Sequence, residues 1–380
     1  MPLRFLTAGD SHGDALVGII EGLPAGIPIP IRDIQRDLKR RRKTYGRSGR
    51  QRIETDPVEI VSGMWRGRTT GAPVGIRILN LGKAPGGKRG GAPGTVPRPG
   101  HADLAGCLKY GLDDIQPIAE RASARSTAMR VAIGAVAKGV LKRFSVEILS
   151  HVRSIGDIDA DPDTSSLDRL MSRVARSQLY CADAAAERKM IGLIKTAWKE
   201  GHTLGGSIEV IASGVPPGLG SHAHWDRKLD ARLAGALMSI QTVKAVEIGA
   251  GLETYKKRGI ESQDAIVLYR GKIKRPTNYA GGIEGGISNG ENIVIRSYAK
   301  PIATAPKQAP TIDMSTLESR ESPYVRSDVC VIPALGVIAE AVVAWELLCA
   351  ILEKFGGDHI EETQANFIAY VKSIGKRTKR

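Results

Sequence analysis

Cations gather in residues 39–52, where eight of the fourteen positions are Lys or Arg. The Arg guanidinium presents a planar fork of N–H donors that matches the oxygens of a carboxylate or a phosphate. A charge run of this kind is also typical of a nucleic-acid-binding patch or of a solvated face. Tyr45 is the one aromatic residue in the block that could stack on a base. The block therefore predicts anion binding and leaves the class of anion open.

Two histidines stand in contexts that could support acid–base chemistry. Ser11-His12-Gly13 precedes an apolar stretch, and Pro99-Gly100-His101 comes just before a predicted helix. Imidazole titrates near neutral pH, which suits proton transfer. A lone histidine is more often structural, so each stays a candidate at this point. The pair in His222-Ala223-His224 lacks an evident third ligand, and we expect a surface loop there and no metal site.

Three more regions carry groups that could hold an anion or a flat ligand. Residues 121–126 offer two guanidiniums and two hydroxyls at the start of a predicted helix, a pattern typical of an anion site. Residues 281–290 are rich in glycine, which lets backbone approach a ligand closely. Residues 300–304 and 326–328 add cations and a carboxylate. Jointly the candidates predict a cationic, glycine-rich pocket for a small polyanion and a planar cofactor.

A short motif, Ser or Thr, any residue, then Gly, opens four apolar segments of the chain. The four copies are Ser11-His12-Gly13, Thr69-Thr70-Gly71, Thr203-Leu204-Gly205 and Ser288-Asn289-Gly290. Three of them continue with the period-two alternation of a half-buried strand, and the first slips out of phase after Leu16. We interpret the motif as an internal pseudo-repeat. The alternative is chance, since turn residues often precede strands.

Helical patterns separate these strand segments. We predict helices over residues 102–110, 122–144, 183–200, 226–240 and 336–355. The last is almost entirely apolar, but Glu340 and Glu346 lie within it, so we expect a buried helix and not a membrane span. Strand blocks alternating with helices, without a strict βαβ order, favour an α+β fold with antiparallel sheets.

Composition bounds the remaining possibilities. The 380 residues are 42% hydrophobic and 25% charged, which excludes an intrinsically disordered chain. The net charge of +15 attracts anions. Four cysteines without metal-ligand spacing, and an N-terminus without a long apolar run, predict reduced thiols and a cytoplasmic protein. We expect a mobile loop at residues 82–97 and a basic tail at residues 373–380.

Several long blocks together resemble one family, chorismate synthase, over about residues 3–355. They include AGDSHG at 8–13, YGRSGRQRIETD at 45–56, RPGHAD at 98–103, ERASARSTAM at 120–129, GGIEGGISNG at 281–290 and RSDVCVIPALG at 326–336. The resemblance implies a carbon–oxygen lyase that performs the anti-1,4-elimination of phosphate from 5-enolpyruvylshikimate 3-phosphate to give chorismate. This is the last common step of the shikimate pathway for aromatic amino acid biosynthesis.

The resemblance also implies the fold, the cofactor and the partners. The reaction requires reduced FMN with no net redox change, and NADPH is a possible reductant. The implied fold is a β-α-β sandwich, with helices packed between antiparallel sheets. Residues 1–360 would form a single catalytic domain, and residues 361–380 the C-terminal helix end and basic tail. A cytoplasmic homotetramer is expected, with no nucleic-acid or membrane partner.

Residue roles follow from the same resemblance. His12 would protonate the departing phosphate, His101 would stand by the reduced flavin, and Asp328 would help take the ring proton by way of the flavin N5. Substrate anions would be bound by Arg41, Arg47, Arg50 and Arg98, of which Arg41 and Arg47 are also linked to NADP in some members. The flavin would be held by Arg121, Ala122, Ser123, Gln241, Thr242, Gly285, Lys300, Pro301, Ile302, Ala303, Thr304 and Arg326. Thr242 departs from the family's usual Ala.

Overall fold

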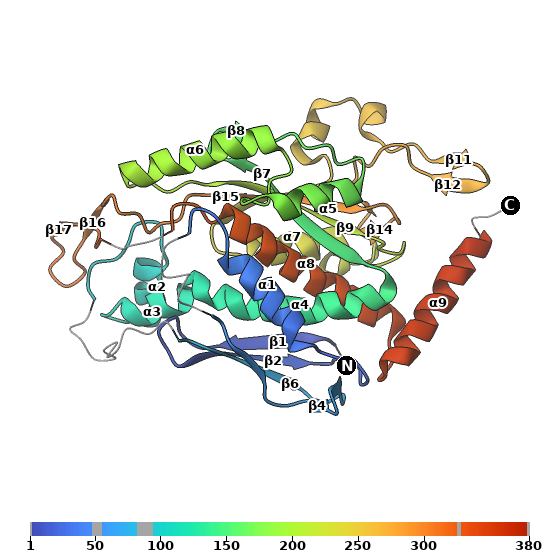
Figure 1. Ribbon diagram of the computed structural model, residues 1–380, viewed down its shortest axis with the longest axis horizontal. Helices are drawn as coiled ribbons and strands as arrows, with labels where there is room; N and C mark the ends of the chain where they lie inside the picture. Colours follow the sequence, from blue (N-terminus) through green and yellow to red (C-terminus); the bar gives the residue numbers. More distant parts are fainter. Residues whose placement is uncertain (1, 48–54, 82–93, 325–327, 378–380) are drawn as a thin grey trace.

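The protein is a three-layer sandwich in which helices separate two antiparallel sheets (Figure 1). The computed structural model describes residues 2–47, 55–81, 94–324 and 328–377. The predicted α+β class, with helices packed between antiparallel sheets, is confirmed. The expectation for residues 82–97 lies largely outside the described residues.

The first sheet has four strands, each antiparallel to its neighbours. In spatial order they are β1 (Arg4–Ala8), β2 (Ala15–Glu21), β6 (Val74–Leu79) and β3 (Val58–Ile60). Alternate side chains face the helices, and Leu16, Ile20 and Ile76 are fully buried there. Leu6 and Ile19, directly paired across β1 and β2, lie on the opposite, exposed face. One covered face accounts for the period-two pattern in the sequence.

The second sheet has five strands and is covered on both faces. In spatial order they are β10 (Val243–Ile248), β15 (Ile293–Ala299), β9 (Gly206–Ser213), β7 (Glu147–Ile155) and β8 (Ile158–Asp159). Ile208 and Val210 face the central core, whereas Ile211 packs with Leu170 and Val174 of helix α5 (Leu167–Arg176) on the other side. Figure 1 shows α6 (Ala184–Glu200) over this outer side too.

Four helices fill the middle layer. They are α1 (Ile31–Arg42), α4 (Thr127–Leu141), α7 (Leu229–Met238) and α8 (Ile332–Phe355). Helices α4 and α8 cross closely, because a Cβ on Gly134 would lie 2.3 Å from the Cβ of Ala341. Of the described helices, α8 alone has the length and apolar composition of a membrane span, and 83% of its most apolar window is buried. It is the core helix that the sequence predicted.

The two halves of the chain repeat one order of elements, β-β-α-β-β-α. The first half runs β1, β2, α1, β3, β6, α4, and the second runs β7, β9, α7, β10, β15, α8. The four predicted motif copies directly precede β2, β6, β9 and β15. These strands form the central pair of each sheet, β2 with β6 and β9 with β15. The predicted pseudo-repeat is therefore confirmed.

Side-chain bonds repeat along with the elements. Each half has a small hairpin, formed by β4 (Met64–Trp65), β5 (Arg68–Thr69), β13 (Ile283–Glu284) and β14 (Ile287–Ser288). Thr69 Oγ1 donates a hydrogen bond to the carbonyl oxygen of Pro24 at 2.6 Å. Ser288 Oγ donates the equivalent bond to Pro216 at 2.7 Å. The hydroxyl of the motif thus ties each hairpin to the loop that follows β2 or β9.

A buried carboxylate joins four elements at the centre of the sandwich. Glu340 of α8 accepts two hydrogen bonds from Arg40 of α1, at 2.7 and 2.8 Å, and one from Lys138 of α4 at 2.5 Å. The Ser150 backbone N–H and hydroxyl of β7 donate two more. Lys138 also binds Asp37 at 2.9 Å. Burial alone would raise the pKa of Glu340, but Lys138 and Arg40 lower that pKa well below its usual range.

Shorter elements lie around the sandwich, and several of them differ from the sequence expectation. The remaining described elements are α2 (Asp103–Tyr110), α3 (Gln116–Ala122), α9 (Ile360–Arg377), β11 (Val267–Tyr269), β12 (Lys272–Lys274), β16 (Pro310–Ile312), β17 (Ser319–Glu321) and short 3₁₀ turns. Helices α1, α3 and α5 were not predicted, and α9 was expected only as a helix end within residues 361–380. Helix α9 extends away from the sandwich in Figure 1, and residues 373–377 belong to it, where we expected a tail. The predicted helix over 122–144 is divided, and α4 begins at Thr127.

Replacing the central carboxylate tests how much the charge cluster stabilises the fold. Glu340→Gln leaves Arg40 and Lys138 buried without their shared counter-charge, so the free energy of unfolding should fall by about 3–5 kcal/mol. Because the pKa of Glu340 is lowered on folding, the deficit should be full at neutral pH and shrink as pH drops below roughly 4.3. Equilibrium urea unfolding at several pH values measures both effects.

The matched control is Glu353→Gln, a partly exposed acid bonded to Arg227 and Arg232. It should cost no more than about 1 kcal/mol. Equal losses of unfolding free energy in the two variants would show that the buried cluster stabilises the fold no more than an exposed ion pair does.

Candidate active site

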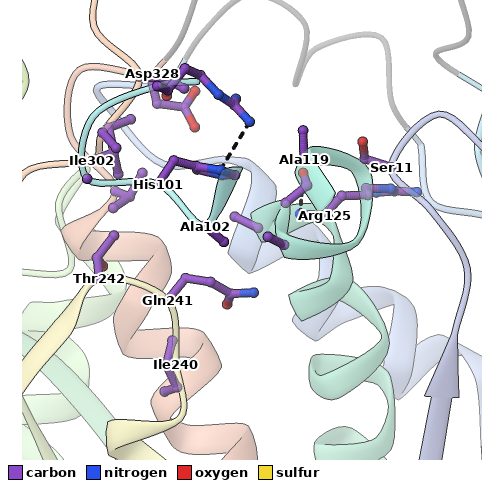
Figure 2. Close-up of a pocket in the computed structure, with 18 of the residues that line it drawn as sticks. Ser11, His101, Ala102, Ala119, Arg125, Ile240, Gln241, Thr242, Ile302 and Asp328 are labelled. Carbon is purple, nitrogen blue, oxygen red and sulfur yellow. Dashed lines mark hydrogen bonds between the residues drawn. The ribbon is translucent and has the colours of Figure 1, made fainter. Parts of the chain in front are cut away.

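One cavity of about 760 Å³ opens at the end of the helical layer where α4 and α8 begin. Residues 123–125 precede α4 and Val331 precedes α8, and all of them line it. The N-terminal ends of helices carry partial positive charge, which favours an anion at this place. Figure 2 shows His101, Asp328 and Ile302 on one side of the cavity and Ser11 and Arg125 on the other.

Most of the predicted site residues that the structure describes line this cavity. They are His12, Arg41, Arg47, Arg98, His101, Ala122, Ser123, Gln241, Thr242, Lys300, Ile302, Ala303, Thr304 and Asp328. They come from both halves of the chain, so the fold gathers residues more than three hundred positions apart. Arg50 and Arg326 lie outside the described residues. Arg121, Gly285 and Pro301 are described but are not among the residues lining the cavity.

Two of these exceptions have a structural explanation. The Arg121 guanidinium turns to β1, where Nη2 donates to the carbonyl oxygen and the hydroxyl of Thr7, each at 3.0 Å. Gly285 forms the β13–β14 turn with Gly286, and their φ angles are +60° and +86°. The equivalent turn in the first half has positive φ at Arg66 as well. The glycines are therefore explained by the positive φ angles of the hairpin turn, which other L-residues adopt with strain.

His12 is held by a carboxylate from α3. Its Nδ1 lies 2.7 Å from Glu120 Oε1, and its backbone N–H donates to Glu120 Oε2 at 2.7 Å. Ser11 Oγ donates to the same Oε2 at 2.6 Å, and Gln116 Nε2 to Oε1 at 2.7 Å. Burial would raise the pKa of Glu120, but the bonds from Ser11 and His12 lower it. Sequence reasoning missed Glu120, which is 108 positions away from His12.

His101 has a similar partner on its own loop. Its Nδ1 lies 2.5 Å from Oδ1 of Asp103, the first residue of α2. Arg98 also binds Asp103, through Nε at 2.7 Å and Nη2 at 2.9 Å. Burial would raise the pKa of the Asp103 carboxyl, yet bonds from His101 and Arg98 hold that pKa well below its usual range. The sequence analysis also missed Asp103, although a carboxylate two positions after His101 could have indicated a partner for that histidine.

Two predicted substrate arginines are fixed by contacts at the cavity wall. Arg41 is almost fully buried, and it donates from Nε to Thr127 Oγ1 and from Nη2 to the carbonyl oxygen of Ala124, each at 3.0 Å. Arg47 Nε lies 3.3 Å from Asp328 Oδ2. Both guanidiniums are therefore pre-oriented, which lowers the cost of ordering them around a ligand.

A second buried acid, Asp56, pairs with two arginines near the cavity wall. Asp56 binds Arg125 through Oδ1 and lies 3.2 Å from Arg42 Nε through Oδ2. Arg125 Nε also donates to Asn80 Oδ1 at 2.8 Å. Of the two guanidiniums predicted near the start of α4, Arg125 thus enters the cavity wall and Arg121 points away. Asp56 and Asn80 carry no local sequence signal for this role.

The Gln241-Thr242 turn forms the floor of the cavity and offers a place for a flat ligand (Figure 2). Gln241 Nε2 donates to Ser126 Oγ at 3.2 Å, while Gln241 Oε1 is buried and accepts no hydrogen bond from the described residues. A donor on a ligand would satisfy that oxygen. Lys300 closes the other side, since its backbone N–H donates to Thr242 and its Nζ to Gly100 at 2.9 Å.

Comparison with known proteins gives a consistent answer. The family model for chorismate synthase matches residues 3–352. Chorismate synthase from Pelobacter propionicus is 47% identical and the one from Acidothermus cellulolyticus is 48% identical, with alignments that cover 98% of this chain and 99% of each relative. A crystal structure of chorismate synthase superposes with a TM-score of 0.81 at 37% identity, covering 99% of both chains. The chain belongs to the chorismate synthase family. It is therefore an enzyme, a carbon–oxygen lyase.

Five of the six sequence blocks that carried the resemblance have residues at this cavity, and the glycine-rich block at 281–290 does not. AGDSHG brings His12, RPGHAD brings Arg98 and His101, and ERASARSTAM brings the loop before α4. Within the described part of the chain, no group of three or more His, Cys, Asp or Glu could hold a metal ion. His224 instead pairs with Asp226 on the surface, at 2.6 Å.

The cavity floor stores backbone strain at Thr242. Its φ is +76°, a region that a β-branched residue adopts at a cost of about 1–2 kcal/mol. Thr242→Gly removes that strain but adds unfolded-state freedom, so the free energy of unfolding should rise by roughly 0.5–1 kcal/mol. Thermal unfolding measures the change.

Thr164→Gly is the matched control for the strain prediction. Thr164 is exposed, lies in a loop and is absent from the residues with positive φ. That substitution should lower the unfolding temperature slightly. A fall for Thr242→Gly as large as the fall for Thr164→Gly would rule out strain relief.

Proposed function

We propose that the protein eliminates phosphate from 5-enolpyruvylshikimate 3-phosphate to give chorismate, the last common step of the shikimate pathway. One observation carries the proposal. A single cavity combines two histidines, each with Nδ1 held by a carboxylate, with a wall of fixed arginines. The histidines can transfer protons to or from a bound small polyanion, and the arginines can neutralise its charge. Family membership supplies the particular substrate.

The charge of the substrate matches the charge of the cavity. The substrate carries two carboxylates and a phosphate, and Arg41, Arg47 and Arg98 lie in the wall. Guanidiniums bind such oxygens bidentately and keep their charge when buried. The helix N-termini of α4 and α8 add partial positive charge at the same end. The arginines would therefore orient the ring before any bond breaks.

Reduced FMN is the cofactor that we propose, and the residues present fit it. Gln241 Oε1 is buried without a donor from the described residues, and Gln241 and Thr242 lie together at the cavity wall, where a ligand N–H could reach that oxygen. Lys300 and the loop through Thr304 could hold the flavin and its phosphate. When bound, reduced FMN would supply the reducing electron density that the elimination needs, without being consumed.

Proton movements fall to side chains at the cavity. The elimination breaks the C–O bond to phosphate and one ring C–H bond, and a new C=C bond forms. His12 would donate a proton to the departing phosphate, and Asp328 would help take up the ring proton. His101, tied to Asp103, would stand beside the flavin. Each of these three roles uses a side chain that can donate or accept a proton and that lines the same cavity.

Several further parts of the proposal concern the protein's surroundings. We infer a cytoplasmic homotetramer, with NADPH as a possible source of electrons for the flavin. The four cysteines are free thiols, which fits a reducing compartment.

Nucleic-acid binding, the other interpretation of the cationic block, finds little support in the structure. Arg40 binds buried Glu340, Arg42 binds buried Asp56, and Arg41 is almost fully buried. A nucleic-acid patch needs guanidiniums that reach outward to phosphates. In the described part of this block, the helix α1 arginines are used within the protein and its cavity.

Anaerobic phosphate release tests the proposed function directly. Incubation with 5-enolpyruvylshikimate 3-phosphate should release phosphate and form chorismate when FMN is reduced with dithionite, and not when FMN stays oxidised. The same assay with NADPH in place of dithionite decides how the flavin is reduced. Flavin binding without phosphate release under reduction would overturn the proposal and leave a binding protein.

Arg47 is the substrate arginine whose removal should be most informative. Arg47→Ala loses a charge-assisted bond to the substrate, worth roughly 1.5–3 kcal/mol, so KM should rise about 10- to 100-fold. Arg169→Ala, on the outer helix α5, should leave KM unchanged because its side chain is 63% exposed and is not among the residues that line the cavity. Steady-state kinetics with reduced FMN measures both variants. An unchanged KM for Arg47→Ala would remove Arg47 from the substrate site.

A further inference from the structure

We propose that Glu120 is a positioning residue for His12, fixing the ring proton on Nδ1 and leaving Nε2 as the atom that exchanges protons with the substrate. The geometry stands by itself, and only the kinetic consequence rests on the proposed function. Glu120 lies on α3, a helix that the sequence did not predict, and it lines the cavity.

Both oxygens of Glu120 are directed at the loop that carries His12. Oε2 accepts from the His12 backbone N–H at 2.7 Å and from Ser11 Oγ at 2.6 Å. Oε1 lies 2.7 Å from His12 Nδ1 and accepts from Gln116 Nε2 at 2.7 Å. The carboxylate thus fixes the backbone and the ring of His12 together. With its side chain 13% exposed, water competes little for these bonds.

The contact selects one tautomer of the imidazole. The pKa of Glu120 is lowered, so the group is an ionised acceptor at neutral pH. An unprotonated Nδ1 would place two lone pairs 2.7 Å apart, whereas a protonated Nδ1 donates to Oε1. The proton therefore stays on Nδ1. The His12 side chain lines the cavity, and with the proton on Nδ1 the other ring nitrogen, Nε2, is the one that can take up or release a proton.

Glu120 differs from the carboxylate that holds the other histidine. Asp103 is shared between His101 and Arg98, so a guanidinium balances its charge. Among the described residues, Glu120 has no Lys or Arg within salt-bridge distance, and its one ionisable partner is His12. Within the described part of the chain, Glu120 thus pairs with one charged or chargeable group, His12, as an orienting carboxylate does.

Glu120→Gln reverses the tautomer without changing the shape of the side chain. The His12 backbone N–H cannot turn around, so it keeps the amide oxygen at the Oε2 position. The amide NH₂ must then occupy the Oε1 position and donate to His12 Nδ1. Donation to Nδ1 forces the ring proton onto Nε2. The Gln116 amide can rotate to accept from the new NH₂ group.

The readout is nitrogen-15 solid-state NMR of the full protein with labelled histidine at alkaline pH, assigned by subtracting the His12→Ala spectrum. Wild type should show His12 with a protonated Nδ1 and an unprotonated Nε2. Glu120→Gln should show the opposite pattern. Its kcat should fall by roughly 10²-fold, the lower range for a positioned acid, while KM changes less than about threefold.

Asp264→Asn is the matched control. Asp264 also holds a loop through a hydroxyl and backbone N–H groups, those of Thr277, Tyr279 and Ala280, but it touches no histidine. It should leave the His12 signals and kcat as in wild type. A loss of kcat as large as that of Glu120→Gln would assign the effect to loop stability and overturn the positioning role.

The remaining outcomes separate this proposal from the proposed function. An unprotonated Nδ1 on His12 in the wild type would overturn the proposal even if Glu120→Gln failed to fold. A reversed tautomer with full kcat would also overturn it, since Nε2 would then not be the working atom. A reversed tautomer in a protein that releases no phosphate from the substrate would support the positioning role and refute the proposed function.

Discussion

The structure depends on a buried ion pair between two helices that occupy equivalent places in the two halves. Gly134-Ala135-Val136-Ala137-Lys138 of α4 corresponds to Gly336-Val337-Ile338-Ala339-Glu340 of α8. Gly134 lets the two helices cross closely at Ala341, and the two charges at the end of the matched segments bind each other. Burying one charge alone would cost several kcal/mol, so opposite signs at equivalent positions offset that cost.

This core interaction also sets the direction of the active-site arginines. Successive residues on a helix point about 100° apart. Because Arg40 is fixed by Glu340 in the core, Arg41 must point toward the cavity and Arg42 toward Asp56. A carboxylate in the middle of the protein therefore controls a guanidinium at the ligand wall. Within the described part of the charge run, Arg40, Arg41 and Arg42 thus have three separate partners, whereas Lys39 and Lys43 are exposed.

Local patterns predicted much of this fold, and long-range contacts account for what they missed. The Ser/Thr-any-Gly motif located the central strands, because a turn followed by period-two apolar residues is a local signal. Helix α8 was predicted for a similar reason, since its apolar run has no break. Glu120 and Asp56 could not be found in this way. Their roles depend on partners dozens of positions away, at His12 and Arg125. Most of the site residues that the family resemblance named, and that the structure describes, do line the cavity, but the resemblance did not distinguish Arg121, which points to β1.

The pseudo-repeat explains why the two halves share a single site. Helices α4 and α8 both begin at the cavity, and α1 and α7 both end there, as a two-fold arrangement of the halves requires. The positive N-terminal ends of α4 and α8 and the negative C-terminal ends of α1 and α7 then meet at one place, so the positive charge of the cavity comes mainly from its Arg and Lys side chains. The side chains have diverged around this shared frame. The first half supplies both histidines with their carboxylates, and the second supplies the floor at Gln241 and the loop at Lys300. The symmetric scaffold thus brings the two histidines and Glu120 of the first half into the same cavity as the Gln241 floor and the Lys300 loop of the second half.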